Sequence, residues 1–186
     1  MGNHWHFVVH PEESATLLSR FFGYLSLLHA TRWQAAHGAT GTGHVYQSRF
    51  KHFMVELDRH LLAVLRYVER NALAAGLVRR AQDWRWSSLH VRRHGPAELK
   101  QLLSDWPVEM PRDWSDWVRQ VNQPQSDKEQ AAIRRSIQRG APFGDEDWAA
   151  RMTKRYHLQS TLRPRGRQKG WRKAKQTTTR NNEKPE

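Results

Sequence analysis

Apolar residues recur every three or four positions in two long stretches of the first half of the chain. This spacing is typical of helices that bury one face. The first stretch follows Pro11-Glu12-Glu13-Ser14, where proline and two acids suit a first turn, and it fades near positions 34–37. The second follows Asp58, a plausible N-cap, and runs from His60 to about Ala75 before Gly76 ends it. The predicted apolar stripes are Leu17, Leu18, Phe21, Leu25 and Leu28 on the first helix, and Leu61, Leu62, Val64, Leu65 and Val68 on the second.

Helices also dominate the predictions for the second half. The segments 126–139 and 145–158 are the clearest, and the sequence Arg139-Gly140-Ala141-Pro142-Phe143-Gly144 predicts a tight turn between them. Such a pair is either a plain helical hairpin or a helix-turn-helix that reads DNA. A short helix or turn is expected at 83–88 and another at 99–103, and two prolines predict a linker at 106–111.

Two segments have the composition of strands. Positions 4–9 alternate polar and apolar residues, and positions 44–56 are rich in aromatic and β-branched residues. The segment 38–43 between the first helix and the second strand contains three glycines and predicts a flexible loop. The expected class is therefore α+β.

Composition narrows the classes of function. The chain has 186 residues and no cysteine, which excludes thiol nucleophiles, zinc–thiolate sites and disulfide scaffolds. No apolar run approaches the roughly 20 residues of a membrane span, and the N-terminus lacks the pattern of a signal peptide. We therefore expect a cytoplasmic protein that does not enter a membrane.

The formal net charge of +13 and a pI near 10.8 favour a polyanionic partner. The segment 161–186 alone carries nine Lys/Arg and two Glu, while the rest of the chain is also basic. A charge run of this kind is either a solubilising tail or a nucleic-acid contact. The nine tryptophans favour nucleic acid, because indoles are good platforms for base stacking.

The first chemical candidate is the histidine pair His4 and His6. On an extended strand the two imidazoles point to the same side, with Trp5 and Phe7 on the other, so together they can chelate a divalent metal. Alternatively, both are ordinary strand histidines, because a chain with 11 histidines forms such a pair readily by chance.

The second candidate is Tyr67 with Asn71, which are one turn apart on the same face of the predicted second helix. Two imidazoles and a carboxamide could hold Mg²⁺ or Mn²⁺ and leave positions open for phosphate oxygens, with Tyr67 as nucleophile. Tyr67 could instead be a half-buried helix tyrosine and Asn71 a residue that weakens the helix end. Three rival tyrosines lack such a partner on their own helix face: Tyr24, Tyr46 and Tyr156.

These segments together resemble the HUH single-tyrosine transposases, above all the REP-associated tyrosine transposases. The matching stretches span the chain to about Lys169 and are jointly specific. They are Asn3-His4-Trp5-His6-Phe7-Val8-Val9, Gly43-His44-Val45-Tyr46-Gln47-Ser48-Arg49-Phe50-Lys51, Tyr67-Val68-Glu69-Arg70-Asn71-Ala72, Ala75-Gly76-Leu77-Val78, Asp83-Trp84-Arg85-Trp86-Ser87-Ser88, Arg139-Gly140, Pro142-Phe143-Gly144 and Leu162-Arg163-Pro164-Arg165-Gly166-Arg167. Gly2 and Ala72 stand where the family has proline.

The resemblance implies a ferredoxin-like HUH domain that cleaves and rejoins single-stranded DNA bearing a hairpin or REP-like sequence, in a bacterial cytoplasm. Tyr67 would attack the phosphate and leave a 5′-phosphotyrosine link, with Mg²⁺ or Mn²⁺ held by His4, His6 and Asn71. Residues expected to bind DNA are Arg49, Lys51, Arg163, Arg165, Arg167 and Lys169. Arg165-Gly166-Arg167 also resembles the core of an AT-hook, which suits a narrow minor groove. A homodimer is compatible with the resemblance.

The resemblance divides the chain into a transposase domain at 1–95, a helical extension at 96–160 and a disordered basic tail at 161–186. Family members usually carry a strand, a helix and another strand before the metal motif, whereas here the motif begins at Asn3. Our hypothesis is that Met1 is an internal methionine of a longer frame or that the gene is a decayed fragment, which an in-frame reading of the upstream DNA tests. A domesticated or truncated relative that binds DNA without cutting it is therefore the alternative function.

Overall fold

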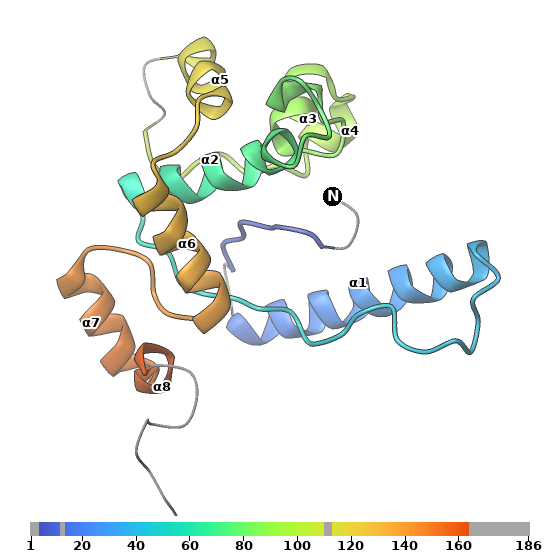
Figure 1. Cartoon of the computed structure of the whole chain (residues 1–186), viewed down its shortest axis with the longest axis horizontal. Coiled ribbons are helices and arrows are strands. Elements are labelled where there is room, and N and C mark those ends of the chain that lie inside the picture. The colour runs from blue at the N-terminus through green and yellow to red at the C-terminus, as the bar shows by residue number, and fades with distance from the viewer. Residues whose placement is uncertain (1–3, 12–13, 110–112, 164–186) are drawn as a thin grey trace, which may run out of the picture.

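The protein is helical in the computed structural model, which describes residues 4–11, 14–109 and 113–163 (Figure 1). The elements, in chain order, are α1 (Ala15–Ala36), α2 (Arg59–Ala74), the 3-10 helix η1 (Ala81–Asp83), α3 (Ser88–His94), α4 (Ala97–Lys100), α5 (Trp114–Asn122), α6 (Asp127–Arg139), α7 (Glu146–Arg155) and α8 (Gln159–Leu162). Within the described residues, β structure is limited to one parallel bridge between Val55 and Phe143. No helix in this part of the chain is long and apolar enough to cross a membrane.

The predicted α+β, ferredoxin-like sheet is therefore wrong for the described residues. Residues 4–10 and 44–54 do run as non-helical segments, but they form no strand ladder. The two segments approach each other through the rings of Trp5 and Tyr46, whose centroids lie 5.6 Å apart. A strand requires a neighbour for its backbone N–H and C=O groups, and alternating side chains do not supply one.

The ends of the helices follow local capping chemistry, as the sequence predicts. Ser14 caps α1, and Asp58 caps α2 by accepting a hydrogen bond from the backbone N–H of His60. Ser126 caps α6, which ends at Gly140 in the left-handed conformation with φ of +71°. The two predicted helices are confirmed as α6 and α7. The predicted tight turn between them is wrong, because residues 140–144 run as an extended segment in which Phe143 bridges to Val55. The use of the pair as a DNA reader stays a prediction.

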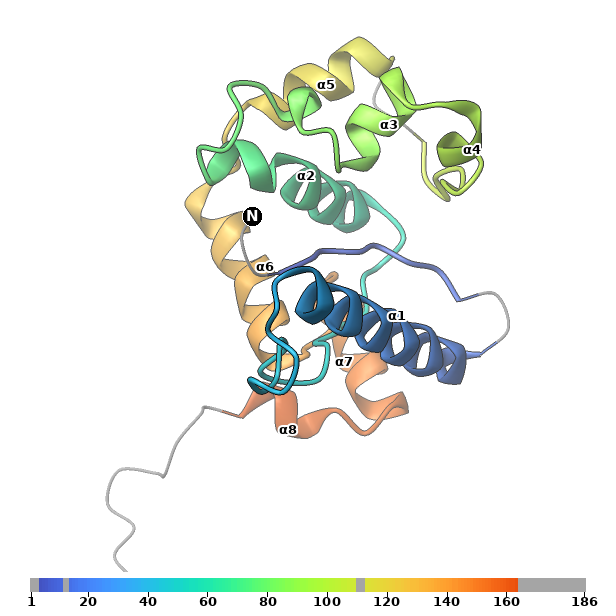
Figure 2. The ribbon, with the colours of Figure 1, turned by 90° about the vertical axis from the view of Figure 1, so that its right-hand side faces the viewer.

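One core cluster joins α2 to the helices that follow it in sequence. Trp117 and Val121 of α5 pack with Leu89 of α3 and Ala81 of η1, and all four are fully buried or nearly so. Figure 2 shows α5 and α3 above α2 in the same layer. The helix α5 is not among the predicted helices, although Asp113 caps it and its apolar residues repeat at helical spacing.

A second cluster joins α2 to α6 and to the turn before α7. Ile133 of α6, Val64 of α2 and Phe143 form its buried centre. Phe143 donates its backbone N–H to Met54 O, and Glu56 donates its backbone N–H to Phe143 O. The linker after α6 is thereby fixed to the segment that leads into α2.

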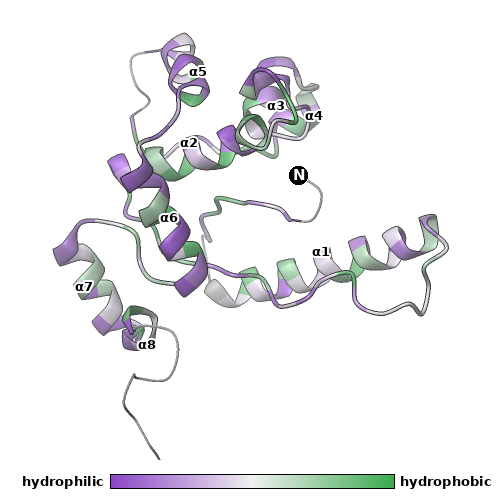
Figure 3. Ribbon diagram, in the orientation of Figure 1, coloured by the Kyte–Doolittle hydropathy of each residue, from purple (hydrophilic) through white to green (hydrophobic). Residues whose placement is uncertain are grey.

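The N-terminal part of the structure is held together differently. In the described residues up to position 60, no side chain is fully buried, and α1 packs on the extended segments through aromatic rings. Phe22 of α1 contacts both Phe7 and Phe50, with ring centroids 5.3 and 5.0 Å away. Apolar residues repeat along α1 in Figure 3, and its predicted stripe is partly exposed, since Leu17 and Phe21 are 44% and 54% accessible.

Candidate active site and metal centre

The N-terminal segment lies between α1 and α2 and presents opposite faces to them (Figures 1 and 2). On one side Trp5 contacts His29 of α1, with ring centroids 4.7 Å apart. On the other side His6 meets Tyr67 of α2, edge to face, with ring centroids 5.9 Å apart. The alternation that predicts a shared side for His4 and His6 is thus realised without a sheet, and their rings lie 5.0 Å apart.

His6 is electrostatically suited to a metal-binding role. Burial, together with the nearby His4, lowers the pKa of His6 from 6.5 to about 4. A neutral imidazole keeps the nitrogen lone pair that a metal ion needs. The residue that the sequence predicts as a ligand is therefore held in its ligand form across the neutral range.

This low pKa leads to a stability prediction. Because the folded-state pKa lies below the unfolded value, His6 contributes fully above pH 6.5, and stability is lost as pH falls toward 4. After discounting for solvent screening, we expect wild type to lose about 1–2 kcal/mol more unfolding free energy than His6→Gln between pH 7 and pH 4. Urea unfolding at several pH values measures this difference, and parallel pH profiles for the two proteins would contradict it.

Tyr67 and Asn71 share one face of α2, as predicted, and both line a small cavity of about 190 Å³ between α2 and α6. Both side chains are half-buried. The cavity is also lined by two arginines, Arg70 of α2 and Arg134 of α6. A phenol, a carboxamide and two guanidinium groups therefore meet at one opening.

The arginines are held by uncharged partners in this arrangement. Arg134 donates through Nη2 to Gln130 Oε1 at 3.2 Å, and Arg70 donates through Nε to the backbone oxygen of Gln123 at 3.0 Å. Neither guanidinium forms an ion pair with a carboxylate of the residues that the structure describes. Guanidinium groups without such a partner are suited to phosphate oxygens. Neither arginine is predicted from the sequence as a site residue, because an arginine on a solvated helix face gives no local signal of its role.

The structure brings together two of the three residues that are predicted to hold Mg²⁺ or Mn²⁺. His4 and His6 are neighbours, His6 is neutral, and Asn71 lies one helical turn from the tyrosine that His6 contacts. Two imidazoles and one carboxamide oxygen leave coordination positions for phosphate and water. Which ion binds, and through which atoms, stays a prediction.

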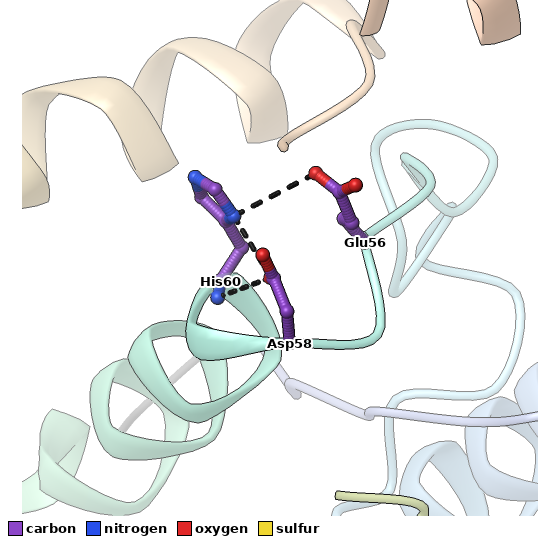
Figure 4. A group of neighbouring side chains, drawn as sticks. All are labelled: Glu56, Asp58 and His60. Atoms are coloured by element: carbon purple, nitrogen blue, oxygen red, sulfur yellow. Dashed lines mark hydrogen bonds and ion pairs between the residues drawn. The ribbon is translucent and has the colours of Figure 1, made fainter. Parts of the chain in front are cut away.

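A second group with metal-ligand chemistry lies at the start of α2 (Figure 4). His60 Nδ1 is 2.8 Å from Asp58 Oδ1 and 3.8 Å from Glu56 Oε2. Burial acts to raise the pKa of Asp58, but hydrogen bonds from His60 and the charges of His60 and Arg59 outweigh it and lower that pKa. Glu56 Oε2 accepts a hydrogen bond from the backbone N–H of Asp145. These contacts give the group a structural role: Asp58 caps α2, and Glu56 links the start of α2 to the start of α7.

The rival tyrosines have different surroundings. Tyr46 forms a hydrogen bond of 2.6 Å with His29 Nδ1, and burial raises its pKa, which disfavours the phenolate. Tyr24 is 68% exposed, and Tyr156 lies beside the guanidinium of Arg155. Tyr67 differs from them in packing its ring edge to face against His6 of the predicted metal pair.

The predicted DNA-binding residues fall in two places. Arg49, Lys51 and Arg163 are exposed, the first two on the extended segment that follows α1. Arg165, Arg167 and Lys169 lie outside the described residues, as does the AT-hook-like core.

A scan against protein-family models, a search of curated proteins and a search of solved structures each returned no match.

Proposed function

We propose that the protein is a metal-dependent, single-stranded DNA endonuclease and strand transferase of the tyrosine transposase class that its sequence resembles, with Tyr67 as the nucleophile. The observation that carries this proposal is the contact between His6 and Tyr67, which are 61 positions apart. Tyr67 also lines a cavity with Asn71 and two arginines. A merely structural tyrosine has no need of a neutral histidine on one side and cations on the other.

In this proposal the Tyr67 oxygen attacks a backbone phosphorus atom of single-stranded DNA. The Tyr67 hydroxyl gives up its proton, and the bond between its oxygen and phosphorus forms as the bond from phosphorus to the 3′ oxygen breaks. The departing oxygen takes up one proton to become a 3′-OH, so the step consumes no net proton. A divalent ion held by His4, His6 and Asn71 would polarise the phosphate. Arg70 and Arg134 are placed to bind its anionic oxygens, and the tyrosine ester conserves the energy needed for rejoining.

The polarity of the reaction gives a direct test. The full-length protein is mixed with Mn²⁺ or Mg²⁺ and a pool of hairpin oligonucleotides with randomised flanks, labelled at the 3′ end or at the 5′ end. The 3′ label should move with the protein in denaturing gels, the 5′ label should appear on a shorter free strand, and EDTA should prevent both. If no metal and no member of the pool gives an adduct, the enzymatic proposal fails.

The second candidate is a DNA-binding protein that does not cut. The observation favouring it is the net charge of +13 together with exposed Arg49 and Lys51 on the segment after α1. It predicts salt-dependent binding of single-stranded DNA with no adduct under any metal condition.

Arg134 provides a test of the phosphate site that both candidates share. Arg134→Ala should weaken single-stranded DNA binding about tenfold at moderate salt and lower the slope of log K against log salt by about 1, because one phosphate contact is lost. Fluorescence anisotropy measures both quantities. The matched control is Arg119→Ala on α5, which removes the same charge from an arginine paired with Asp116. Equal effects of the two substitutions would contradict a specific phosphate contact.

A further inference from the structure

A second and larger hollow, of about 530 Å³, opens beside the candidate active site, between the N-terminal segment, α1 and the loop that follows α1. His4 lines this hollow, and its ring lies 5.0 Å from that of His6, which contacts the nucleophile. A volume of this size is in the range of small-molecule binding pockets. Nothing in the proposed phosphate chemistry accounts for it.

Aromatic side chains form its walls. Trp5 and Tyr46 both pack on His29, with ring centroids 4.7 and 5.8 Å from that imidazole. Trp33, near the end of α1, also lines the hollow and stays 40% exposed, with His37 stacked on its ring at 4.3 Å. The wall contains indole and phenol rings that are held in position by neighbouring rings.

The rim is polar and fixed. Gln34 of α1 donates through Nε2 to the backbone oxygen of Gly43 at 2.7 Å, which fastens the loop to the helix. Gly43 has φ of +117°, a conformation that side chains with a Cβ rarely adopt. Thr42, Gly43 and His44 line the same hollow as the aromatic wall and bring polar groups to it.

The charge of this part of the chain favours an anionic ligand. The stretch 14–55, which forms α1, the loop and the return segment, contains no Asp or Glu but four Lys/Arg and four histidines. Arg32 is exposed next to Trp33 on α1. A ligand in the hollow therefore contacts aromatic rings, and residues 14–55 around it carry positive or neutral side chains only.

We propose that this hollow binds an unpaired base of single-stranded DNA, stacked on Trp33, next to the phosphate that Tyr67 attacks. A nucleotide combines a base with a flat apolar face and polar edges with a negatively charged phosphate. The aromatic wall suits the face of the base, the polar rim suits its edges, and the surrounding cations suit the phosphate. Base-paired DNA cannot enter, because its bases are stacked on each other. The identity of the ligand as DNA rests on the proposed function, whereas the stacking site rests on the hollow itself.

The test compares two fluorescent probes of equal phosphate number in EDTA, by anisotropy with the full-length protein. One is an oligothymidylate of about 20 nucleotides, and the other is an oligomer of the same length made of abasic units. Wild type should prefer the thymidylate. Trp33→Ala should weaken thymidylate binding by about 5- to 100-fold and leave abasic binding unchanged, and Trp33→Phe should restore most of the loss.

Trp86→Ala is the matched control, because Trp86 is 71% exposed and lies away from the hollow; it should leave the preference intact. The inference is overturned if wild type shows no preference for bases, if Trp33→Ala weakens both probes equally, or if Trp33→Phe behaves like Trp33→Ala. Failure of the proposed function looks different: the preference for bases depends on Trp33, but no covalent adduct forms with metal. If the adduct forms but the preference for bases does not depend on Trp33, the enzymatic proposal is supported and the base-binding site is overturned.

Discussion

Tyr67→Phe should abolish the covalent protein–DNA adduct while leaving DNA binding within about twofold of wild type. The substitution removes the hydroxyl that forms the phosphate ester and keeps the ring that packs edge to face on His6. Because the nucleophile has no substitute, we expect adduct formation to fall to background rather than to a reduced rate. The measurement is a denaturing gel of metal-loaded protein with 3′-labelled hairpin DNA.

The control for Tyr67→Phe is Tyr24→Phe, which removes the hydroxyl of a tyrosine that is 68% exposed on α1. It should form the adduct at the wild-type rate. Anisotropy in EDTA shows whether the Tyr67 variant still binds DNA. An adduct that persists in Tyr67→Phe and disappears in Tyr24→Phe would transfer the nucleophilic role and contradict the proposed site.

Glu69→Ala should lower the free energy of unfolding by about 3 kcal/mol. Glu69 is 2% exposed, accepts from Trp117 Nε1 at 2.7 Å through one oxygen, and accepts from Ser88 Oγ at 2.9 Å through the other. Burial raises its pKa, while these hydrogen bonds and the charge of Arg92 oppose the shift. Alanine would leave two donors without a partner and a small void between α2 and α5.

Urea unfolding followed by tryptophan fluorescence measures this loss. The matched control is Glu98→Ala in the first turn of α4, where the glutamate is exposed, and there we expect a change within about 0.5 kcal/mol. A change below about 1 kcal/mol at Glu69 would show that the buried carboxylate does not support the contact between α2 and α5. Since α2 carries Tyr67, this contact also positions the proposed nucleophile.

Helix positions could be predicted where the signal is local. The caps Asp58 and Ser126 and the left-handed Gly140 mark helix ends through their own chemistry, and the boundaries of α2 and α6 follow within about a residue. The helix α5 carries the same kind of signal in Asp113, Trp114 and Trp117, but the two prolines just before it obscure that signal.

The strands could not be predicted correctly, because a strand depends on a partner that local sequence does not specify. Residues 4–9 alternate as a strand does, and the alternation does place His6 on α2 and Trp5 on α1. The prediction fails for the backbone, because residues 4–10 and 44–54 form no ladder of hydrogen bonds with each other. An extended segment between two helices shows the same pattern as a strand.

The candidate site was predictable only in part. Tyr67 and Asn71 share a face by helical spacing, which sequence alone gives, but the approach of His6 to Tyr67 is tertiary and rested on the family resemblance. Arg134 reaches the same cavity from α6, 67 positions after Tyr67, and no local pattern marks it. Glu69 was also missed as a core residue, because a glutamate on a helix is ordinarily solvated.

Mass spectrometry of the trypsin-digested adduct identifies the residue that becomes covalently attached to DNA, which we expect to be Tyr67. Trypsin cuts after Arg66 and Arg70, so Tyr67 lies in the peptide Tyr67-Val68-Glu69-Arg70, and each of the other three tyrosines falls in a different peptide. After nuclease treatment, we expect this peptide to carry a nucleotide attached through its 5′ phosphate to Tyr67. A nucleotide on another residue, or an unmodified Tyr67 peptide in protein that carries DNA, would contradict it.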